Sequence, residues 1–133
     1  MARKAIGATK ELPGAVRGTE RLLDFIPRIT PRFTSPRHLA RLAELIERAL
    51  REPVRALVSV PPRHGKTELL LHGIAWVLGR APETELGYVS YAADIARSKS
   101  RIARDYAGVI GVDLREDANA LHEWLTPGGG GLR

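Results

Sequence analysis

The chain has 133 residues, 44% of them hydrophobic, which suits one domain with a buried core and is too short for a two-domain enzyme. No apolar run approaches the ~18 residues of a membrane span, and the N-terminus lacks the apolar segment of a signal peptide, so we expect a cytoplasmic protein. The absence of cysteine excludes disulfides and thiolate metal sites, and the net charge of +6 favours an anionic partner.

Residues 1–34 are predicted to form a basic, largely irregular arm, because Gly and Pro are scattered through them and apolar residues show little periodicity. One helical turn is expected between Glu20 and Phe25. Its apolar side chains would dock on a core: Leu22, Leu23, Phe25 and Ile26. Residues 1–55 carry 12 of the 21 basic residues but only 6 of the 15 acidic ones. Two interpretations of this excess stay open: contact with nucleic-acid phosphates, and a solvated arginine-rich segment.

A second region, residues 35–133, is predicted to begin with a helix. Ser35 is a good N-cap residue, and Pro36 suits the first helical position, where its missing N–H costs nothing. Apolar residues then recur at helical spacing as far as about Arg51: Leu39, Leu42, Ile46, Ala49 and Leu50. His38 is either a contact on the nucleotide side of the protein or a packed or exposed histidine.

The run Ala56–Val60 is apolar and rich in β-branched residues, as expected for a central strand of a parallel sheet. Pro61 and Pro62 end this strand, because neither residue can donate to a sheet ladder. Gly65 then opens a segment whose apolar residues have helical spacing. A strand, a tight loop and a helix in this order predict a phosphate-binding P-loop.

The residue types of this loop fit phosphate chemistry. Loop amides and a helix N-terminus would point at phosphate oxygens, and the helix dipole adds positive charge there. Gly65 lets the backbone approach closely, Lys66 would reach the β- and γ-phosphates, and Thr67 would help hold Mg²⁺. The full pattern, Gly-x-x-x-x-Gly-Lys-Ser/Thr, has glycine where this chain has Val60. The alternative is a chance tripeptide.

The segment after the loop predicts a helix followed by a second strand. The apolar helix Leu69–Leu78 would be broken at Arg80–Pro82, and Leu86–Tyr91 has the composition of a strand. With the strand before the loop, these elements predict a right-handed βαβ unit. The expected fold is therefore α/β: a three-layer αβα P-loop NTPase with a parallel sheet, of which only part is present.

Another helix is predicted over Ala92–Ala107, with an apolar stripe made of Ile95, Ile102 and Tyr106. Four basic residues on its other side are candidates for contacts with DNA phosphates: Arg97, Lys99, Arg101 and Arg104. Asp94 and Asp105 offset part of their charge. A solvated helix face is therefore the preferred interpretation.

Residues 109–133 contain weaker signals. Val109–Asp113 resembles a Walker B strand, whose acid serves the metal, but its glycine disfavours a core strand and no second acid follows directly. A loop is therefore the preferred interpretation. Ala120–Thr126 predicts a third short strand near a sheet edge, and Pro127–Gly131 predicts a turn or a flexible end.

From about Phe33 onward, the chain resembles the first part of the ATPase domain of the large terminase subunit of tailed bacteriophages, the motor that drives DNA into the procapsid. The resemblance is carried by Pro36-Arg37-His38, by Pro61–Glu68 as a variant Walker A motif, and by Tyr88–Ala96. The Pro-Pro-Arg-His-Gly-Lys form is fairly specific, and it accounts for Val60 in place of glycine. Trp124-Leu125-Thr126 followed by glycines also resembles that family.

The resemblance implies an ATP and Mg²⁺ site made by the variant Walker A motif: Pro62, Arg63, His64, Gly65, Lys66, Thr67 and Glu68. Lys66 and Thr67 would hold phosphates and Mg²⁺. Arg63 would be the catalytic residue, acting on the γ-phosphate as an arginine finger does, or alternatively would form a salt bridge with a nearby acid. The implied partners are double-stranded DNA, the portal protein and the small terminase subunit, in the cytoplasm of a bacterial host. A homo-oligomeric ring is implied only for a complete protein.

The family's Walker B acids, catalytic glutamate and nuclease domain have no counterpart in this sequence, which looks like a truncated or incomplete terminase of a phage or prophage. Without a water-activating carboxylate, we expect the chain alone to bind nucleotide weakly and to hydrolyse little. Two alternatives stay open. One is another P-loop NTPase, such as a helicase-like protein or a small kinase. The other is a non-catalytic DNA-binding or assembly remnant with a vestigial P-loop.

Overall fold

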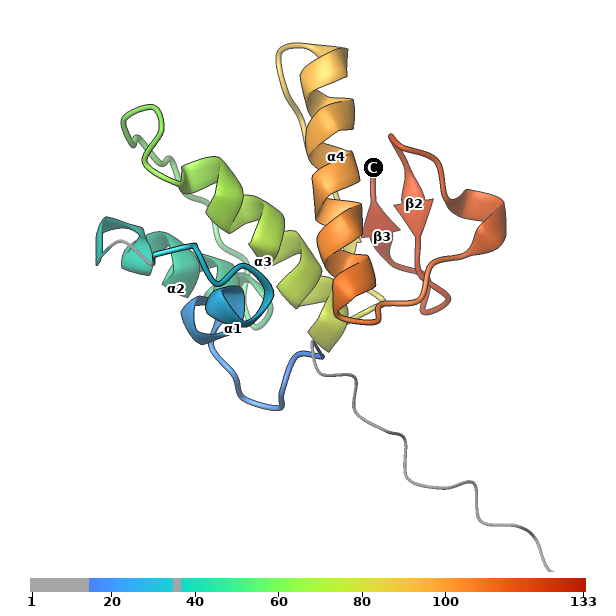
Figure 1. The fold of residues 1–133 in the computed structure, drawn as a ribbon, viewed down its shortest axis with the longest axis horizontal. Helices are drawn as coiled ribbons and strands as arrows, with labels where there is room; N and C mark the ends of the chain where they lie inside the picture. The colour runs from blue at the N-terminus through green and yellow to red at the C-terminus, as the bar shows by residue number, and fades with distance from the viewer. Residues whose placement is uncertain (1–14, 35–36) are drawn as a thin grey trace, which may run out of the picture.

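The computed structural model describes residues 15–34 and 37–133, and in these residues helices dominate. Four α-helices are separated by loops, two short 3-10 turns and three two-residue strands (Figure 1). The helices are α1 (Leu22–Ile29), α2 (Ala40–Ala49), α3 (Lys66–Arg80) and α4 (Ala93–Val109); the 3-10 turns are η1 (Arg37–Leu39) and η2 (Glu116–Ala118); the strands are β1 (Glu85–Leu86), β2 (Trp124–Leu125) and β3 (Gly131–Leu132).

Helix α3 is the centre of the core. It packs most extensively against α4 and also contacts α1 and α2, and α4 lies between α3 and the small sheet (Figure 1). Most of its side chains are buried, on nearly all sides: Leu69, Leu71, His72, Ala75, Trp76, Val77 and Leu78. A helix that is apolar all round is stable only when neighbouring elements cover it. Helices α1, α2 and α4 provide this cover.

Helix α1 confirms the predicted helical turn and extends it to Ile29. Leu22, Phe25 and Ile26 have no exposed surface, and they belong to the same apolar cluster as α3 and α4. The Leu22 amide donates to the Glu47 carboxylate of α2 at 2.9 Å, which satisfies one of the free N–H groups of the first turn of α1. The core therefore includes residues on both sides of the predicted boundary at residue 34.

The sheet is small and mixed. Its strand order is β1-β3-β2, with β1 and β3 parallel and β2 and β3 antiparallel. The glycine-rich tail, predicted as a turn or flexible end, therefore supplies the central strand β3. The predicted third strand forms only at β2, which lies at the sheet edge as expected.

The predicted three-layer α/β fold with a parallel sheet is wrong for this structure, and the first cause is the segment before the loop. Ala56–Val60 forms no strand. Residues 53–60 make no backbone–backbone hydrogen bond with another described residue, and the Leu57 side chain is fully exposed. A strand is defined by its ladder partner, and none of the described segments pairs with this run.

The second predicted strand, Leu86–Tyr91, is also wrong over most of its length. Only Glu85 and Leu86 pair with β3. One further backbone hydrogen bond follows, from the Tyr88 amide to the Arg133 carbonyl oxygen at 2.9 Å. Val89 and Tyr91 then lie almost fully exposed. With neither flanking strand formed around α3, no βαβ unit exists in the described part of the chain.

The helix predictions fare better because helical hydrogen bonds are local. Helix α3 begins at Lys66 and reaches the predicted break at Arg80, and α4 differs from its prediction by one or two residues at each end. The helix predicted from Ser35 to about Arg51 appears as η1 and α2, while Ser35 and Pro36 lie outside the described residues. Val109 ends α4 and a loop follows to Asp113, so the preferred interpretation of that segment is confirmed.

Candidate nucleotide-binding loop

Gly65 makes the turn from the loop into α3. Its φ of 80° is in the left-handed region, which residues with a Cβ atom rarely adopt. An added Cβ would also lie 3.3 Å from Leu39 Cδ1, and the Phe33 ring lies just beyond. Arg63, two residues earlier, has a φ of 62° and is the only non-glycine residue with positive φ among those described. The left-handed backbone of Arg63 and of Gly65 turns the chain sharply just before α3 begins.

The N-terminus of α3 has no side-chain cap among the described residues. Gly65 is its N-cap and has no side chain that could accept from the first-turn amides. The first amides of any α-helix lack intrahelical partners and, with the helix dipole, attract anions. Residues 60–68 line a hollow of about 510 Å³ beside these amides.

Two histidines, His38 and His64, hold the loop through hydrogen bonds to its backbone. His38 Nε2 donates to the His64 carbonyl oxygen at 3.0 Å, and His64 Nδ1 donates to the Pro62 carbonyl oxygen at 2.8 Å. The two rings meet edge to face, with centroids 5.6 Å apart. His38 is thus an exposed residue that supports the loop. Sequence spacing could not assign that contact, which joins residues 26 positions apart.

The predicted phosphate-contacting residues of the loop lie together around the hollow. Pro62, Arg63 and His64 are exposed, and Lys66 and Thr67 are half-buried at the start of α3. Arg63 forms no ion pair with any acid in the described ranges, so its proposed alternative, a structural salt bridge, is absent there.

Glu68 also lines the hollow, but its carboxylate is bound by a residue of the neighbouring helix α4. Tyr106 of α4 donates its hydroxyl to Glu68 Oε1. One turn along α3, His72 donates through Nδ1 to the Glu68 carbonyl oxygen at 2.8 Å and accepts through Nε2 from the Thr30 hydroxyl at 2.9 Å. The His72 and Tyr106 rings stack, with centroids 4.2 Å apart. Sequence periodicity placed Tyr106 on an apolar stripe and did not predict this polar cluster.

Burial sets the protonation of this cluster. Loss of solvent lowers the pKa of His72, and this outweighs the opposing hydrogen bond and charge of Glu68. Burial raises the pKa of Tyr106 to about 12, with a further contribution from the bond to the Glu68 carboxylate. At neutral pH, His72 is therefore an uncharged imidazole and Tyr106 is a hydrogen-bond donor.

The donor set of the loop fits a phosphate chain better than an isolated metal ion. Within the described ranges, no three His, Asp or Glu side chains gather as metal ligands. Thr67 supplies one hydroxyl, so Mg²⁺ would be held here by Thr67 together with the phosphate oxygens of the nucleotide. The uncapped amides, the left-handed Gly65 and the adjacent Lys66 match the needs of those phosphates.

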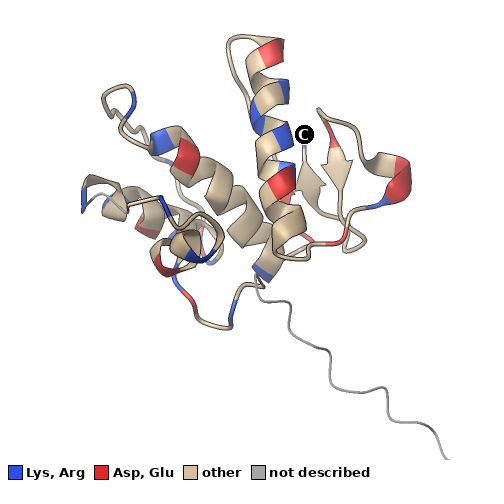
Figure 2. Ribbon diagram, viewed as in Figure 1, with Lys and Arg blue, Asp and Glu red and all other residues tan. Residues whose placement is uncertain are grey.

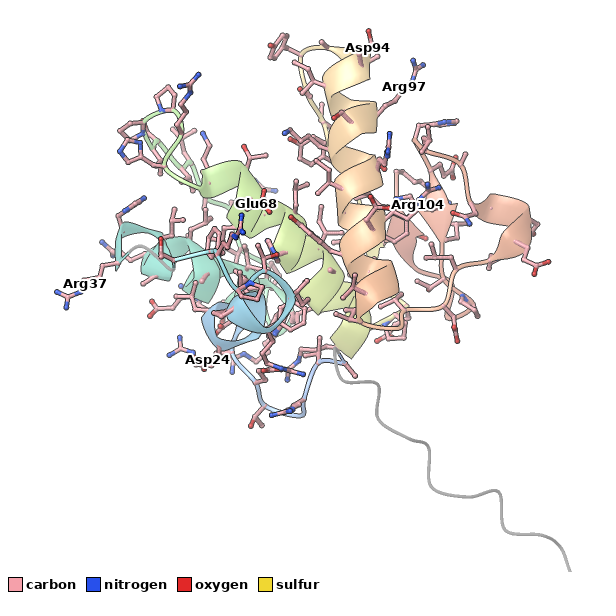
Figure 3. All side chains as sticks on the ribbon, viewed as in Figure 1. Asp24, Arg37, Glu68, Asp94, Arg97 and Arg104 are labelled. Carbon is pink, nitrogen blue, oxygen red and sulfur yellow. The ribbon has the colours of Figure 1, made fainter. Side chains whose placement is uncertain are left out.

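The four basic candidates on α4 are distributed along the helix rather than gathered at one site (Figures 2 and 3). Arg97 and Arg101 are exposed, and Arg97 approaches Asp94 at 3.5 Å. Arg104 instead donates to Asn119 Oδ1 at 3.1 Å, which ties α4 to the segment before β2. Lys99 is half-buried.

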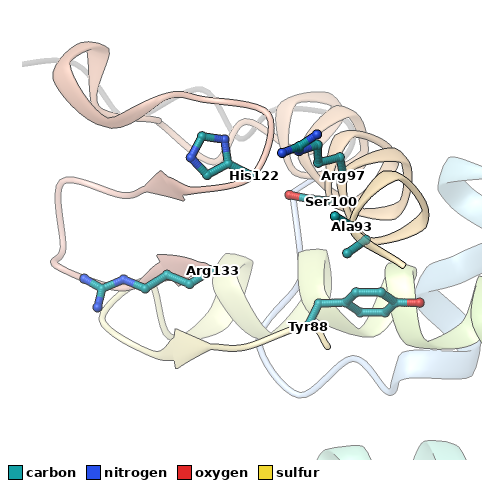
Figure 4. A pocket seen from close by; sticks show the side chains of 7 residues that line it. Tyr88, Ala93, Arg97, Ser100, His122 and Arg133 are labelled. Atoms are coloured by element: carbon teal, nitrogen blue, oxygen red, sulfur yellow. The ribbon is translucent and has the colours of Figure 1, made fainter. Parts of the chain in front are cut away.

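A second hollow, of about 260 Å³, lies between α4 and the sheet (Figure 4). Its lining residues come from both elements and from the segment after β1: Tyr88, Ala93, Ala96, Arg97, Ser100, His122 and Arg133. Both arginines are already engaged, since Arg133 Nε lies 3.0 Å from Glu123 Oε1 and Arg97 lies beside Asp94. Sequence reasoning did not predict this hollow, because it forms between segments far apart in the chain.

Within residues 15–34 and 37–133, no helix has the length and apolarity needed to span a membrane. Comparison of the chain with protein-family models, with curated proteins and with solved structures finds no match.

Proposed function

We propose that the loop Pro61–Thr67 binds the phosphate chain of a nucleoside triphosphate, ATP with Mg²⁺. The observation that carries the proposal is the uncapped N-terminus of α3, which follows a left-handed Gly65 and faces a hollow lined by Lys66 and Thr67. These features supply free amides, a close backbone approach and a cation at the same point.

Each residue has a separate role in this proposal. The amides of Gly65 and Lys66 would donate to phosphate oxygens, and the Lys66 ammonium would neutralise the β- and γ-phosphates. Thr67 would be a ligand of Mg²⁺, which neutralises further phosphate charge. Arg63, exposed at the tip of the loop, would reach the γ-phosphate.

The wider function that we propose is a part in viral DNA packaging, as an ATP-binding portion of a terminase large subunit. The variant Walker A residues Pro61–Glu68 support it, and the exposed Arg97 and Arg101 supply cations for DNA phosphates. Double-stranded DNA, the portal protein and the small terminase subunit are the partners that this proposal entails, in the host cytoplasm. The support for this proposal comes from the loop residues and not from the three-layer fold, which the structure lacks.

Binding is proposed here rather than rapid hydrolysis. Phosphoryl transfer to water requires a carboxylate or equivalent group that orients the attacking water. Glu68, the carboxylate that lines the hollow, already accepts a hydrogen bond from Tyr106. We therefore expect the chain to bind nucleotide and to turn it over slowly.

The test is titration of the 133-residue chain with ATP and Mg²⁺ by isothermal calorimetry, comparing the wild type with Lys66→Ala. Removing the ammonium should weaken binding by roughly 10- to 100-fold, the range expected for a charged hydrogen-bonding group. Arg51→Ala, an exposed cation outside the loop, is the matched control and should bind as the wild type does. Equal affinity of Lys66→Ala and the wild type would contradict the proposal and favour a vestigial loop.

A further inference from the structure

Glu68 occupies a position from which a free carboxylate would compete with a bound phosphate. With Gly65 as N-cap and Lys66 as the first helical residue, Glu68 is the third residue of α3. A glutamate at this position commonly reaches back to accept from the backbone N–H of the N-cap residue. In this chain, that N–H belongs to Gly65 and is among the groups that the proposed phosphate site needs. The helix dipole attracts the carboxylate to the same place.

The structure holds the carboxylate elsewhere. Tyr106 Oη donates to Glu68 Oε1 from the neighbouring helix α4. At neutral pH, the phenol is fully protonated, so this donor is always present. Within the described residues, no side-chain hydrogen bond, from Glu68 or any other residue, caps the N-terminus of α3.

Tyr106 is itself held in place by contacts from other elements. Its ring stacks on that of His72, with an interplanar angle of 24°. His72 is completely buried, and both its ring nitrogens are engaged, by the Glu68 carbonyl oxygen and the Thr30 hydroxyl. The Phe33 ring also packs against His72, with centroids 5.8 Å apart. The hydroxyl of Tyr106 therefore has a fixed position from which to bind the carboxylate.

We propose that Tyr106 is a positioning residue for the phosphate site: by binding the Glu68 carboxylate, it keeps the amides at the start of α3 free for an anion. This inference rests on the proposed function and adds a residue from outside the loop. Tyr106 does not contact the phosphates in this proposal. It acts through Glu68.

The experiment is a double-mutant cycle on ATP·Mg²⁺ affinity with Tyr106→Phe and Glu68→Ala. The phenylalanine keeps the ring that stacks on His72 and removes only the hydroxyl. Released from Tyr106, the carboxylate would occupy the N-terminus of α3, and affinity should fall roughly three- to ten-fold, as expected for one unfavourable charge near a helix terminus. In the Glu68→Ala background, the same change should have no effect, because the competing carboxylate is gone. Tyr91→Phe, at an exposed tyrosine, is the matched control and should bind normally.

The cycle separates positioning from a general effect on folding. Circular dichroism and thermal unfolding establish that each variant is folded at the titration temperature. If Tyr106→Phe weakens binding equally in the wild-type and the Glu68→Ala backgrounds, Tyr106 acts through the fold and the inference is wrong. An unchanged affinity of Tyr106→Phe, with Lys66→Ala impaired, overturns the inference alone. An unchanged affinity of Lys66→Ala overturns the proposed function, and the positioning role with it.

Discussion

His72 shows how a single buried polar residue can be fully satisfied inside an otherwise apolar helix. Its side chain has no exposed surface, yet both ring nitrogens have partners and the ring stacks on Tyr106. The Thr30 hydroxyl donates to it from the segment after α1, so the neutral tautomer is the form that fits. A protonated ring would carry a charge with no exposed surface, and this loss of solvent is what lowers the pKa of His72.

This arrangement predicts a stability that depends on pH. The pKa of His72 is lowered in the folded state, so below its ordinary value of 6.5 the unfolded chain binds a proton that the folded chain resists. The contribution of the neutral ring is complete above pH 6.5 and is lost as pH falls toward and through the lower folded-state pKa. Urea unfolding at about pH 7.5, 6.5 and 5.5 should show that the free energy of unfolding decreases as the pH falls. The decrease should be smaller for His72→Gln.

His122→Gln, at an exposed histidine, is the control for this measurement and should retain the wild-type pH dependence. If the His72→Gln and wild-type curves differ by a constant amount across this range, the protonation of His72 is not linked to folding.

At the scale of elements, the small sheet depends on backbone geometry in its central strand. Strand β3 begins at Gly131, whose φ of 147° lies at the limit of the left-handed side, and whose α-carbon packs directly on the backbone of β2. A Cβ at this position would overlap the Trp124 carbonyl oxygen and lie 2.7 Å from the Leu125 α-carbon. The end of the glycine run, which was predicted to be flexible, is thus part of a strand that requires glycine at position 131.

Two glycines of this tail allow steric overlap and backbone strain to be compared. Gly129 also has a positive φ, of 95°, but nothing lies within 4 Å of an added Cβ. We expect Gly129→Ala to cost about 1–2 kcal/mol from backbone strain alone, and Gly131→Ala to cost about 3 kcal/mol or more because the strands must also separate. Chemical denaturation of both variants checks this order, and equal costs would show that β3 does not pack as described.

At the scale of the whole molecule, the core is well covered, while two extended segments expose large apolar side chains. Leu57 lies on one segment, and Val89 and Tyr91 lie on the other; all three side chains are at least nine-tenths exposed. The surrounding helices satisfy their hydrogen bonds internally and bury their apolar faces against α3. Each extended segment buries only part of its apolar surface, because Val58 and Tyr88 pack on the core while these three side chains do not.

These three side chains predict self-association of the chain, because exposed apolar side chains are a common cause of contact between molecules. Replacing Leu57, Val89 and Tyr91 together by serine should shift sedimentation at about 100 μM toward the monomer and leave the free energy of unfolding within about 1 kcal/mol, since exposed substitutions cost little. Leu121→Ser, at a residue that is 47% exposed, is the control. A wild-type chain that sediments as a monomer at that concentration would contradict the prediction.

How far sequence reasoning reached in this protein depends on the range of the interactions involved. The helical spacing of apolar residues predicted α3 and α4 closely, and Gly65-Lys66-Thr67 predicted the turn at which α3 begins. These features depend on hydrogen bonds four residues apart and on the conformational freedom of one glycine. The contacts of His38 with the loop, and of Glu68 with Tyr106, join residues 26 and 38 positions apart and have no signature in local spacing.

The sequence by itself determined where the helices run and where a loop with a free helix N-terminus begins, because each helix closes its own hydrogen bonds. Tertiary structure alone decided which extended segments became strands. Ala56–Val60 has a strand composition but pairs with no described segment, whereas the glycine-rich tail lacks that composition and supplies the central strand of the sheet. The physical reason is that a strand satisfies its backbone only through another segment, so strand formation is decided by which segments the packed helices bring together.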